Sequence, residues 1–267
     1  MSASKRSPFK ARVAQLDTKT RIECAKTMIR DKIINHVLEV VAIQANNEYL
    51  VYSNRLTEQI PRSYAANAYN VLSQTSFLFA VLRTAALWDT ADENTASILT
   101  IVEYVDDDDV INALAEEHRH AHASLGVGML NKPHSDPAIQ AALERSIQDS
   151  QNRFAEKQAW KARRRLRRAI CISRKIAQSP ALERLRNSRD KHIAHALIQT
   201  RRERRNPVAP MKYGDEVHLL RQSIWLAENF YCWVNGTSFD IQRDSRDIAK
   251  KRAQELWENV ELHIPSR

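Results

Sequence analysis

The chain has 267 residues and a formal net charge of +9, with 41 lysines and arginines against 32 aspartates and glutamates. It is long enough to bury a substantial core, as one large domain or two small ones. Only four glycines and eight prolines are present, and because sheets need frequent turns, this scarcity favours long helices with few breaks. The positive charge suits nucleic acid or an anionic membrane surface, although solubility alone would also account for it.

Cysteine usage and hydropathy argue against several classes of protein. Cys24, Cys171 and Cys232 are odd in number and far apart, which favours buried thiols in a reducing compartment over a disulfide scaffold or a zinc knuckle. The most apolar stretch, residues 76–88, is too short to cross a bilayer. The basic N-terminus also lacks the apolar core of a secretory signal. We therefore expect a cytoplasmic protein without membrane association.

Apolar residues at three- and four-residue spacing predict a chain of helices. Residues 1–18 are polar and basic and are expected to form a flexible arm before a single domain over residues 19–267. The predicted helices cover residues 22–43, 62–89, a short segment capped by Asp92 or Asn94 and ending at Tyr104, 110–125, 137–178, 180–204, 211–236 and 245–262. The second is apolar almost all round near Phe77–Leu87, as a central helix would be. With no convincing strand, the predicted fold class is all-α, a multi-helix up-and-down bundle.

The helix predicted from residue 180 places a permanent charge on its apolar face. At about 100° per residue, Arg189 lies near the centre of a stripe made by Leu182, Leu185, Ile193 and Ala196. A guanidinium keeps its proton, so burying it without a partner is costly. The stripe is therefore expected to face a cleft, an acidic partner or a subunit interface. The alternative is a structural salt bridge from Arg189 to a carboxylate elsewhere.

The residues from Arg189 to His195, RDKHIAH, resemble the signature of the HEPN superfamily. That signature is an Arg and a polar residue followed by a His four to six residues beyond the Arg, and Arg189, Asp190 and His195 match it. An overlapping match of Arg186 and Asn187 with His192 has the same spacing. Together with the upstream stretch FLFAVLRTAALWD, the motif is similar to AbiU-type abortive-infection proteins.

This resemblance implies a metal-independent endoribonuclease of antiphage defence or a toxin–antitoxin system, with a site built across a homodimer and no cofactor. A histidine can take or give a proton at the ribose or the leaving oxygen, and an arginine can stabilise charge on the phosphate. The implied roles are acid or base for His195, phosphate stabiliser for Arg189 and orienting residue for Asp190, with His192 a second-rank participant. RNA, a second copy and an antitoxin protein are the expected partners. The alternative function is a non-catalytic RNA-binding or protein-interaction module.

A second signal is an arginine-rich helix. Six of the eight residues 161–168 are basic, and the helical wheel leaves Lys161, Arg164, Arg165, Arg168 and Lys175 on its outward side. We expect these residues and Arg186 to contact RNA phosphates. Arg201, Arg202, Arg204 and Arg205 would extend the same positive surface. A solvated face balanced by acidic helices and a membrane-binding face remain alternatives.

The other patterns favour ordinary packing. His118 and His122 share a helix face, as two metal ligands would, but no third ligand is evident, so incidental surface histidines and no metal site are expected. Trp225, Phe230, Tyr231 and Trp233 favour core or interface packing over base stacking. The four glycines fit no phosphate-binding loop, and no serine-centred nucleophile elbow occurs.

Overall fold

Helices make up all the regular structure of the described part of the chain, residues 8–123, 135–194 and 197–264 of a computed structural model. They are α1 (Pro8–Val13), α2 (Thr18–Met28), α3 (Ile34–Leu50), α4 (Tyr64–Ala86), α5 (Ile98–Val105), α6 (Asp108–Ala123), α7 (Pro137–Ala177), α8 (Pro180–Ser188), α9 (Asp215–Asn235) and α10 (Arg246–Trp257). Short π-helical stretches occupy Ile29–Ile33, Arg189–Ala194 and Ile241–Ser245, and Thr57–Gln59 forms a 3-10 turn. The predicted all-α class is confirmed.

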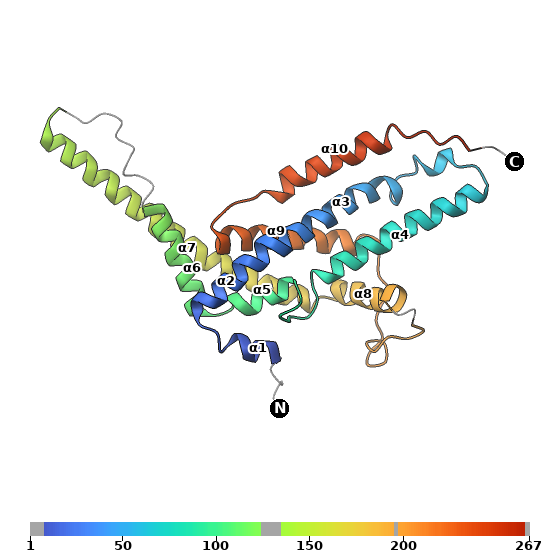
Figure 1. The fold of residues 1–267 in the computed structure, drawn as a ribbon, viewed down its shortest axis with the longest axis horizontal. Coiled ribbons are helices and arrows are strands. Elements are labelled where there is room, and N and C mark those ends of the chain that lie inside the picture. The colour runs from blue at the N-terminus through green and yellow to red at the C-terminus, as the bar shows by residue number, and fades with distance from the viewer. Residues whose placement is uncertain (1–7, 124–134, 195–196, 265–267) are drawn as a thin grey trace.

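Helix α9 occupies the middle of the bundle. It packs against α2, α3, α4, α7 and α8 (Figure 1), and its apolar side, including Leu226 and Phe230, is fully buried. Helix α3 lies between α4 and α10, and α6 packs along α7. The N-terminal part of α7 extends beyond the bundle (Figure 1), and none of its side chains from Pro137 to Phe154 is buried. None of the described helices has the length and apolarity needed to span a bilayer.

Several predicted helix ends are confirmed because their signals are local. The Asp136 carboxylate accepts a hydrogen bond from the Ala138 backbone N–H at 2.8 Å and caps α7. The Ser179 hydroxyl does the same for α8, accepting from the Leu182 N–H at 3.3 Å. Such caps satisfy backbone donors that the first turn leaves without partners. At the end of α9, Gly236 has φ of 75°, a conformation in which glycine avoids strain.

The N-terminal segment differs from the expected arm. Residues 8–13 form α1, and Phe9 and Val13 are buried in the main core. The Phe9 ring meets the Tyr104 ring edge-on, with centroids 5.5 Å apart. Two apolar side chains on one short helix outweigh its polar composition, so the arm prediction does not hold for α1.

Helix α4 is not the central helix that its composition predicted. Only its C-terminal end is buried, through Ala80, Val81, Thr84 and Ala85. The N-terminal part extends along α3 past the core (Figure 1). Its outer side exposes Tyr64 (73% exposed), Val71 (64%), Leu72 (51%) and Phe79 (43%). These four positions fall on one side of the helix, and we call them the α4 stripe.

Three smaller expectations also need correction. Helix α5 is capped by Ser97, whose hydroxyl accepts from the Thr100 N–H, rather than by Asp92 or Asn94. The last helix ends at Trp257 instead of residue 262. All three cysteines are free, as expected, but Cys171 is exposed and the other two are half-buried.

Candidate functional site

The motif lies on a π-helical turn rather than on a continuous α-helix. Helix α8 ends at Ser188, and Arg189–Ala194 form the turn, which we call the motif turn. The prediction of one helix to residue 204 is therefore wrong. Beyond the turn, the Leu197 N–H donates to the Lys191 carbonyl at 2.8 Å and the chain folds back. A wheel of 100° per residue does not describe this segment, and π-helical turns occur frequently at functional sites.

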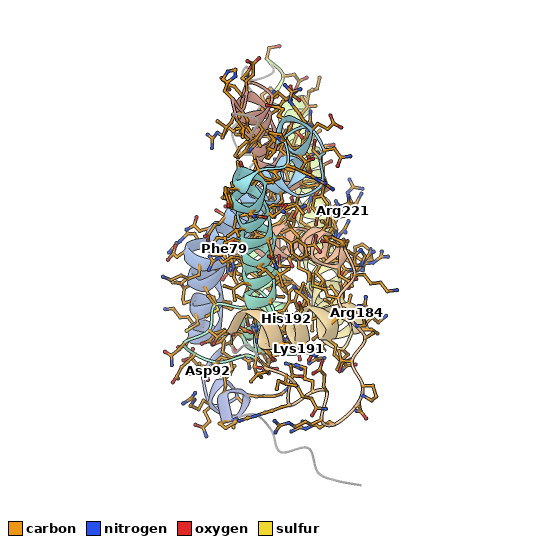
Figure 2. The ribbon with its side chains drawn as sticks, turned by 90° about the vertical axis from the view of Figure 1, so that its right-hand side faces the viewer. Phe79, Asp92, Arg184, Lys191, His192 and Arg221 are labelled. Carbon is orange, nitrogen blue, oxygen red and sulfur yellow. The ribbon has the colours of Figure 1, made fainter. Side chains whose placement is uncertain are left out.

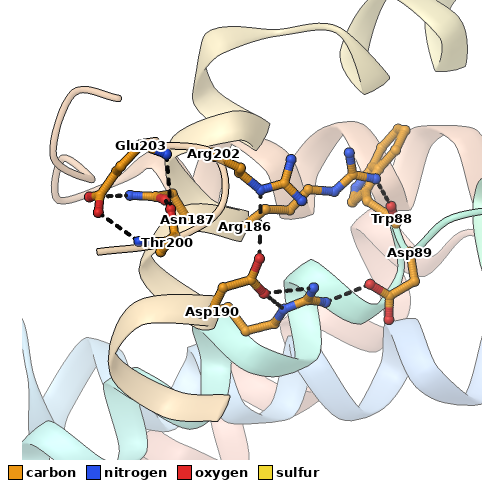
Figure 3. A network of polar contacts seen from close by, with 9 residues as sticks. Trp88, Asp89, Arg186, Asn187, Asp190, Thr200, Arg202 and Glu203 are labelled. Atoms are coloured by element: carbon orange, nitrogen blue, oxygen red, sulfur yellow. Dashed lines mark hydrogen bonds and ion pairs between the residues drawn. The ribbon is translucent and has the colours of Figure 1, made fainter. Parts of the chain in front are cut away.

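Arg189 is held between two carboxylates. Its Nη1 donates to Asp89 at 2.5 Å and its Nε to Asp190 at 3.0 Å (Figure 3). Burial lowers the pKa of the guanidinium, but these hydrogen bonds outweigh it, so the net pKa lies above its usual value. Its side chain is 19% exposed. The contact with Asp89 agrees with the expectation that the face carrying Arg189 meets an acidic partner. It also agrees with the alternative expectation of a structural salt bridge.

Two further arginines complete the cluster around Arg189. Arg202 Nε lies 3.6 Å from the second oxygen of Asp190, and this buried nitrogen has no hydrogen-bond partner among the described residues. Arg186 donates to the Trp88 carbonyl (Figure 3), and burial lowers the pKa of its guanidinium. Three guanidinium groups thus face the two carboxylates of Asp89 and Asp190. One positive charge is left unbalanced, which suits an anionic ligand.

A second network fixes the far side of the motif turn. The buried Asn187 amide donates to Glu203 at 3.0 Å and accepts from the Thr200 hydroxyl at 2.5 Å. Glu203 also accepts from Lys191 Nζ at 3.0 Å and from the Thr200 N–H at 3.0 Å. The hydrogen bond from Asn187, followed by those from Thr200 and Lys191, lowers the pKa of Glu203 to about 2. These polar contacts explain why the chain turns back instead of continuing as a helix.

Of the two motif histidines, only His192 lies within the described residues. His192 is exposed on the motif turn, on the face that also presents Lys191 and Phe79 (Figure 2). His195, the other candidate, lies outside the described residues. The structure therefore brings Arg189, Asp190 and the backbone of His192 onto one short turn, and α4 packs directly against it.

The predicted RNA-binding residues separate into three places. Lys161, Arg164, Arg165 and Arg168 share one open cavity with Trp160 and Trp233. Lys175 lines a different cavity beside Asp106–Asp108. Arg186 belongs to the Arg189 cluster. Of the four arginines beyond the motif turn, Arg202 pairs with Asp190, and Arg201, Arg204 and Arg205 are exposed.

The histidine pair of α6 has a packing role instead of lying free on the surface. His118 is buried, its Nε2 lies 3.2 Å from the Trp233 carbonyl oxygen, and its ring centroid is 5.0 Å from that of Trp233. Burial is the main cause lowering the pKa of His118, which favours the neutral ring. Within the described residues, no group of three or more His, Cys, Asp or Glu side chains could hold a metal ion.

Sequence reasoning named Asp190 but missed Asp89, the other carboxylate that holds Arg189. Asp89 follows α4 and lies 100 positions before its partner. It is the last residue of FLFAVLRTAALWD, the stretch that carried part of the family resemblance, so that shared ending was the available signal. Asn187 was part of the overlapping motif match, but its role in closing the turn was not predicted, and Thr200 and Glu203 had no comparable signal because each is an ordinary polar residue in a charged segment.

The comparisons with known proteins support the family resemblance. The family model HEPN_AbiU2, described as AbiU2, matches residues 31–256. No curated protein and no solved structure shows a significant match. The matched segment covers most of the chain, from α3 through α10, and includes Asp89, the motif turn and Glu203. The chain belongs to the AbiU2 family of HEPN proteins.

Proposed function

We propose that the chain is an endoribonuclease of antiphage defence or a toxin–antitoxin system, acting without a divalent metal. The observation that supports the proposal is the motif turn, on which two carboxylates hold the guanidinium of Arg189 and the side chain of His192, three residues further on, is exposed. At least two of the five N–H groups of Arg189 have no partner among the described residues. They are available to a phosphate.

The proposed reaction is attack of a ribose 2′-hydroxyl on the adjacent phosphate. One imidazole takes the hydroxyl proton, and another gives a proton to the leaving 5′-oxygen. The products are a 2′,3′-cyclic phosphate and a 5′-hydroxyl. Arg189 stabilises the charge that grows on the phosphate oxygens, because its fork is already oriented by Asp89 and Asp190. Asp190 is a positioning residue, and His192 and His195 are the candidate acid and base.

The surroundings of the motif turn favour RNA as the substrate. The Arg189 cluster has one unbalanced positive charge. The exposed Arg201, Arg204 and Arg205 lie in the segment that follows the motif turn. None of these three has an ion pair within the described part of the chain. Guanidinium groups left unpaired at a surface favour contact with phosphates.

A second copy is the partner we propose for completing the site. The α4 stripe exposes large apolar side chains in a row, which a soluble chain usually covers. Phe79 of that stripe and His192 lie on one face (Figure 2), and α4 packs on the motif turn. Two copies joined across this face by a two-fold axis would bring a pair of motif turns together. An antitoxin protein stays a prediction.

RNA cleavage in EDTA tests the function. The wild type should cut a labelled single strand, leaving 5′-hydroxyl ends that a kinase labels without prior phosphatase treatment. Arg189→Ala should lower the rate about 100-fold or more, and His192→Ala or His195→Ala should have a comparable effect. Arg163→Ala and His218→Ala are matched controls, because Arg163 pairs with Glu116 and His218 is exposed on α9.

Two results would contradict the proposal. Cleavage that survives Arg189→Ala and both histidine changes would remove the motif from the reaction. Binding of RNA by the wild type with no cleavage would favour a non-catalytic RNA-binding module. One observation supports that rival, since Asp89 and Asp190 already give Arg189 the contacts of a structural salt bridge.

A further inference from the structure

The arginine-rich part of α7 has two faces with different electrostatic surroundings. Arg163, Arg167 and Arg174 point toward the α6 side and pair with Glu116 at 3.1 Å, with Asp108 at 2.8 Å and with Asp106. Lys161, Arg164, Arg165 and Arg168 have no ion pair among the residues that the structure describes. Among the described residues, ion pairs thus form on one face only, and the acidic residues beside the other face, Glu228 and Asp240, line a cavity with Arg165 without pairing with it. That other face keeps four cations within two helical turns.

Three indole rings border the unbalanced face. Trp160 belongs to α7 itself and is exposed, while the half-buried Trp225 and Trp233 come from α9. The Arg164 guanidinium lies 5.2 Å from the Trp160 ring centroid, and that of Arg168 lies 5.7 Å from the Trp225 centroid. Trp160 and Trp233 line one open cavity of about 320 Å³ together with the four cations. The four cations therefore form one concave surface with Trp160 and Trp233, and Trp225 adjoins it through its contact with Arg168.

The pairing of positions shows that this surface follows both helices. Trp160 shares its cavity with Trp233, and Arg168 contacts Trp225, so α7 and α9 run antiparallel along it. Trp225 is ten residues from Asp215, or about 15 Å along the helix axis. Asp215 holds Arg184 of α8 with two hydrogen bonds of 2.7 and 2.8 Å. The surface therefore leads toward the helix that carries the motif turn.

We propose that this surface, the tryptophan groove of Trp160, Arg164, Arg165, Arg168, Trp225 and Trp233, binds single-stranded RNA by stacking unpaired bases and contacting their phosphates. The proposal rests on the proposed function, whose substrate it specifies as unpaired RNA. Aromatic rings and guanidinium planes both stack on bases. A guanidinium lying over an indole leaves its outer face available to a base. A duplex hides its base faces, so it cannot use such contacts.

The same observations favour RNA over a lipid surface. An interfacial helix lays a continuous apolar face into the headgroup region. In the tryptophan groove, guanidinium groups lie over two of the indoles, and the cavity is concave. Concave, cationic and aromatic surfaces suit a strand whose charges and rings alternate.

Binding of a 2′-O-methyl RNA strand of about 12 nucleotides tests the groove, because this probe lacks the 2′-hydroxyl that the proposed reaction needs. Fluorescence anisotropy of the labelled strand gives affinity, and quenching of protein tryptophan gives a second readout. Trp160→Ala should weaken binding at least about fivefold, and Trp160→Phe should restore most of it. Phe154→Ala is the control, since Phe154 is exposed on the same helix but contacts His122.

Charge is tested by two double variants that remove the same charge from opposite faces. Arg164→Ala with Arg168→Ala should weaken binding and reduce the slope of log affinity against log salt by about 1.4, as expected for two lost phosphate contacts. Arg163→Ala with Arg167→Ala should leave both values near those of the wild type, because these arginines pair with α6. The same probe annealed to its complement should bind more weakly.

Three results would each contradict the proposal that the groove binds single-stranded RNA. They are unchanged binding by Trp160→Ala, an equal loss of affinity in the two double variants, and equal affinity for duplex and single strand. If the wild type binds no RNA but floats with phosphatidylserine vesicles, and Trp160→Ala abolishes the flotation, the surface is a membrane-binding surface instead. The two proposals fail separately. If the wild type binds RNA through the groove but never cuts unmodified RNA, the nuclease proposal fails and the groove proposal stands.

Discussion

Replacing Asp89 by Asn tests how firmly Arg189 is held. The exchange keeps the shape of the side chain and one acceptor but removes the charge opposite Nη1, which lies 2.5 Å from the carboxylate. Exposed ion pairs contribute about 0–1 kcal/mol, whereas breaking a buried pair costs about 3–5 kcal/mol. The side chains of Arg189 and Asp89 are 19% and 36% exposed. Their coupling should therefore be intermediate, about 1–2 kcal/mol.

The assay is a double-mutant cycle in urea. The free energies of unfolding of the wild type, Asp89→Asn, Arg189→Met and the double variant give the coupling between the two side chains. Arg167 and Asp108 provide the reference pair, since they are 2.8 Å apart but much more exposed. Their coupling should stay below about 0.5 kcal/mol. Equal coupling in the two pairs would show that Asp89 does not hold Arg189 in place, and the reasoning that two carboxylates fix its fork would fail.

Two further predictions follow from the same structure. The double variant Val71→Glu with Leu72→Glu should be a monomer in light scattering where the wild type is a dimer, because it places two charges in the α4 stripe. The control Ile248→Glu, at a similarly exposed site on α10, should leave the dimer intact. A wild type that is monomeric at micromolar concentration would contradict the proposed second copy. Since the folded pKa of Glu203 is depressed from 4.5 to about 2, its contribution to stability is fully present above pH 4.5 and is lost as the pH falls toward 2. Glu203→Gln should therefore reduce the loss of stability over that window, measured by urea unfolding, and Glu255→Gln, exposed on α10, should not.

Features specified within a few residues could be predicted from the sequence. The starts of α7 and α8 follow from an Asp or Ser before a Pro, and the end of α9 follows from a glycine in the left-handed region. The all-α class follows from composition and periodicity in the same way. The caps act through the backbone of their own turn, and apolar spacing acts within one helix, so no distant partner decides either.

Features that depend on distant partners could not be predicted. The helical wheel separated Arg165 from Arg163, but it could not show that Arg163 pairs with the carboxylate of Glu116 on α6. The same limit applied to α4, whose apolar residues looked central although its N-terminal half lies beyond the core. The π-helical turn at Arg189 was missed because Asn187, Thr200 and Glu203 close it through contacts that no periodicity encodes.

Helix α4 links the two parts of the proposed site. Its exposed stripe ends at Phe79. Asp89, three residues after the end of the helix at Ala86, accepts a hydrogen bond from Arg189. A second copy bound to the stripe would contact α4, which packs against the motif turn. Closely packed interiors transmit small displacements. Docking of a second copy on α4 would then set the position of the Asp89 carboxylate, and through it the direction of the Arg189 fork.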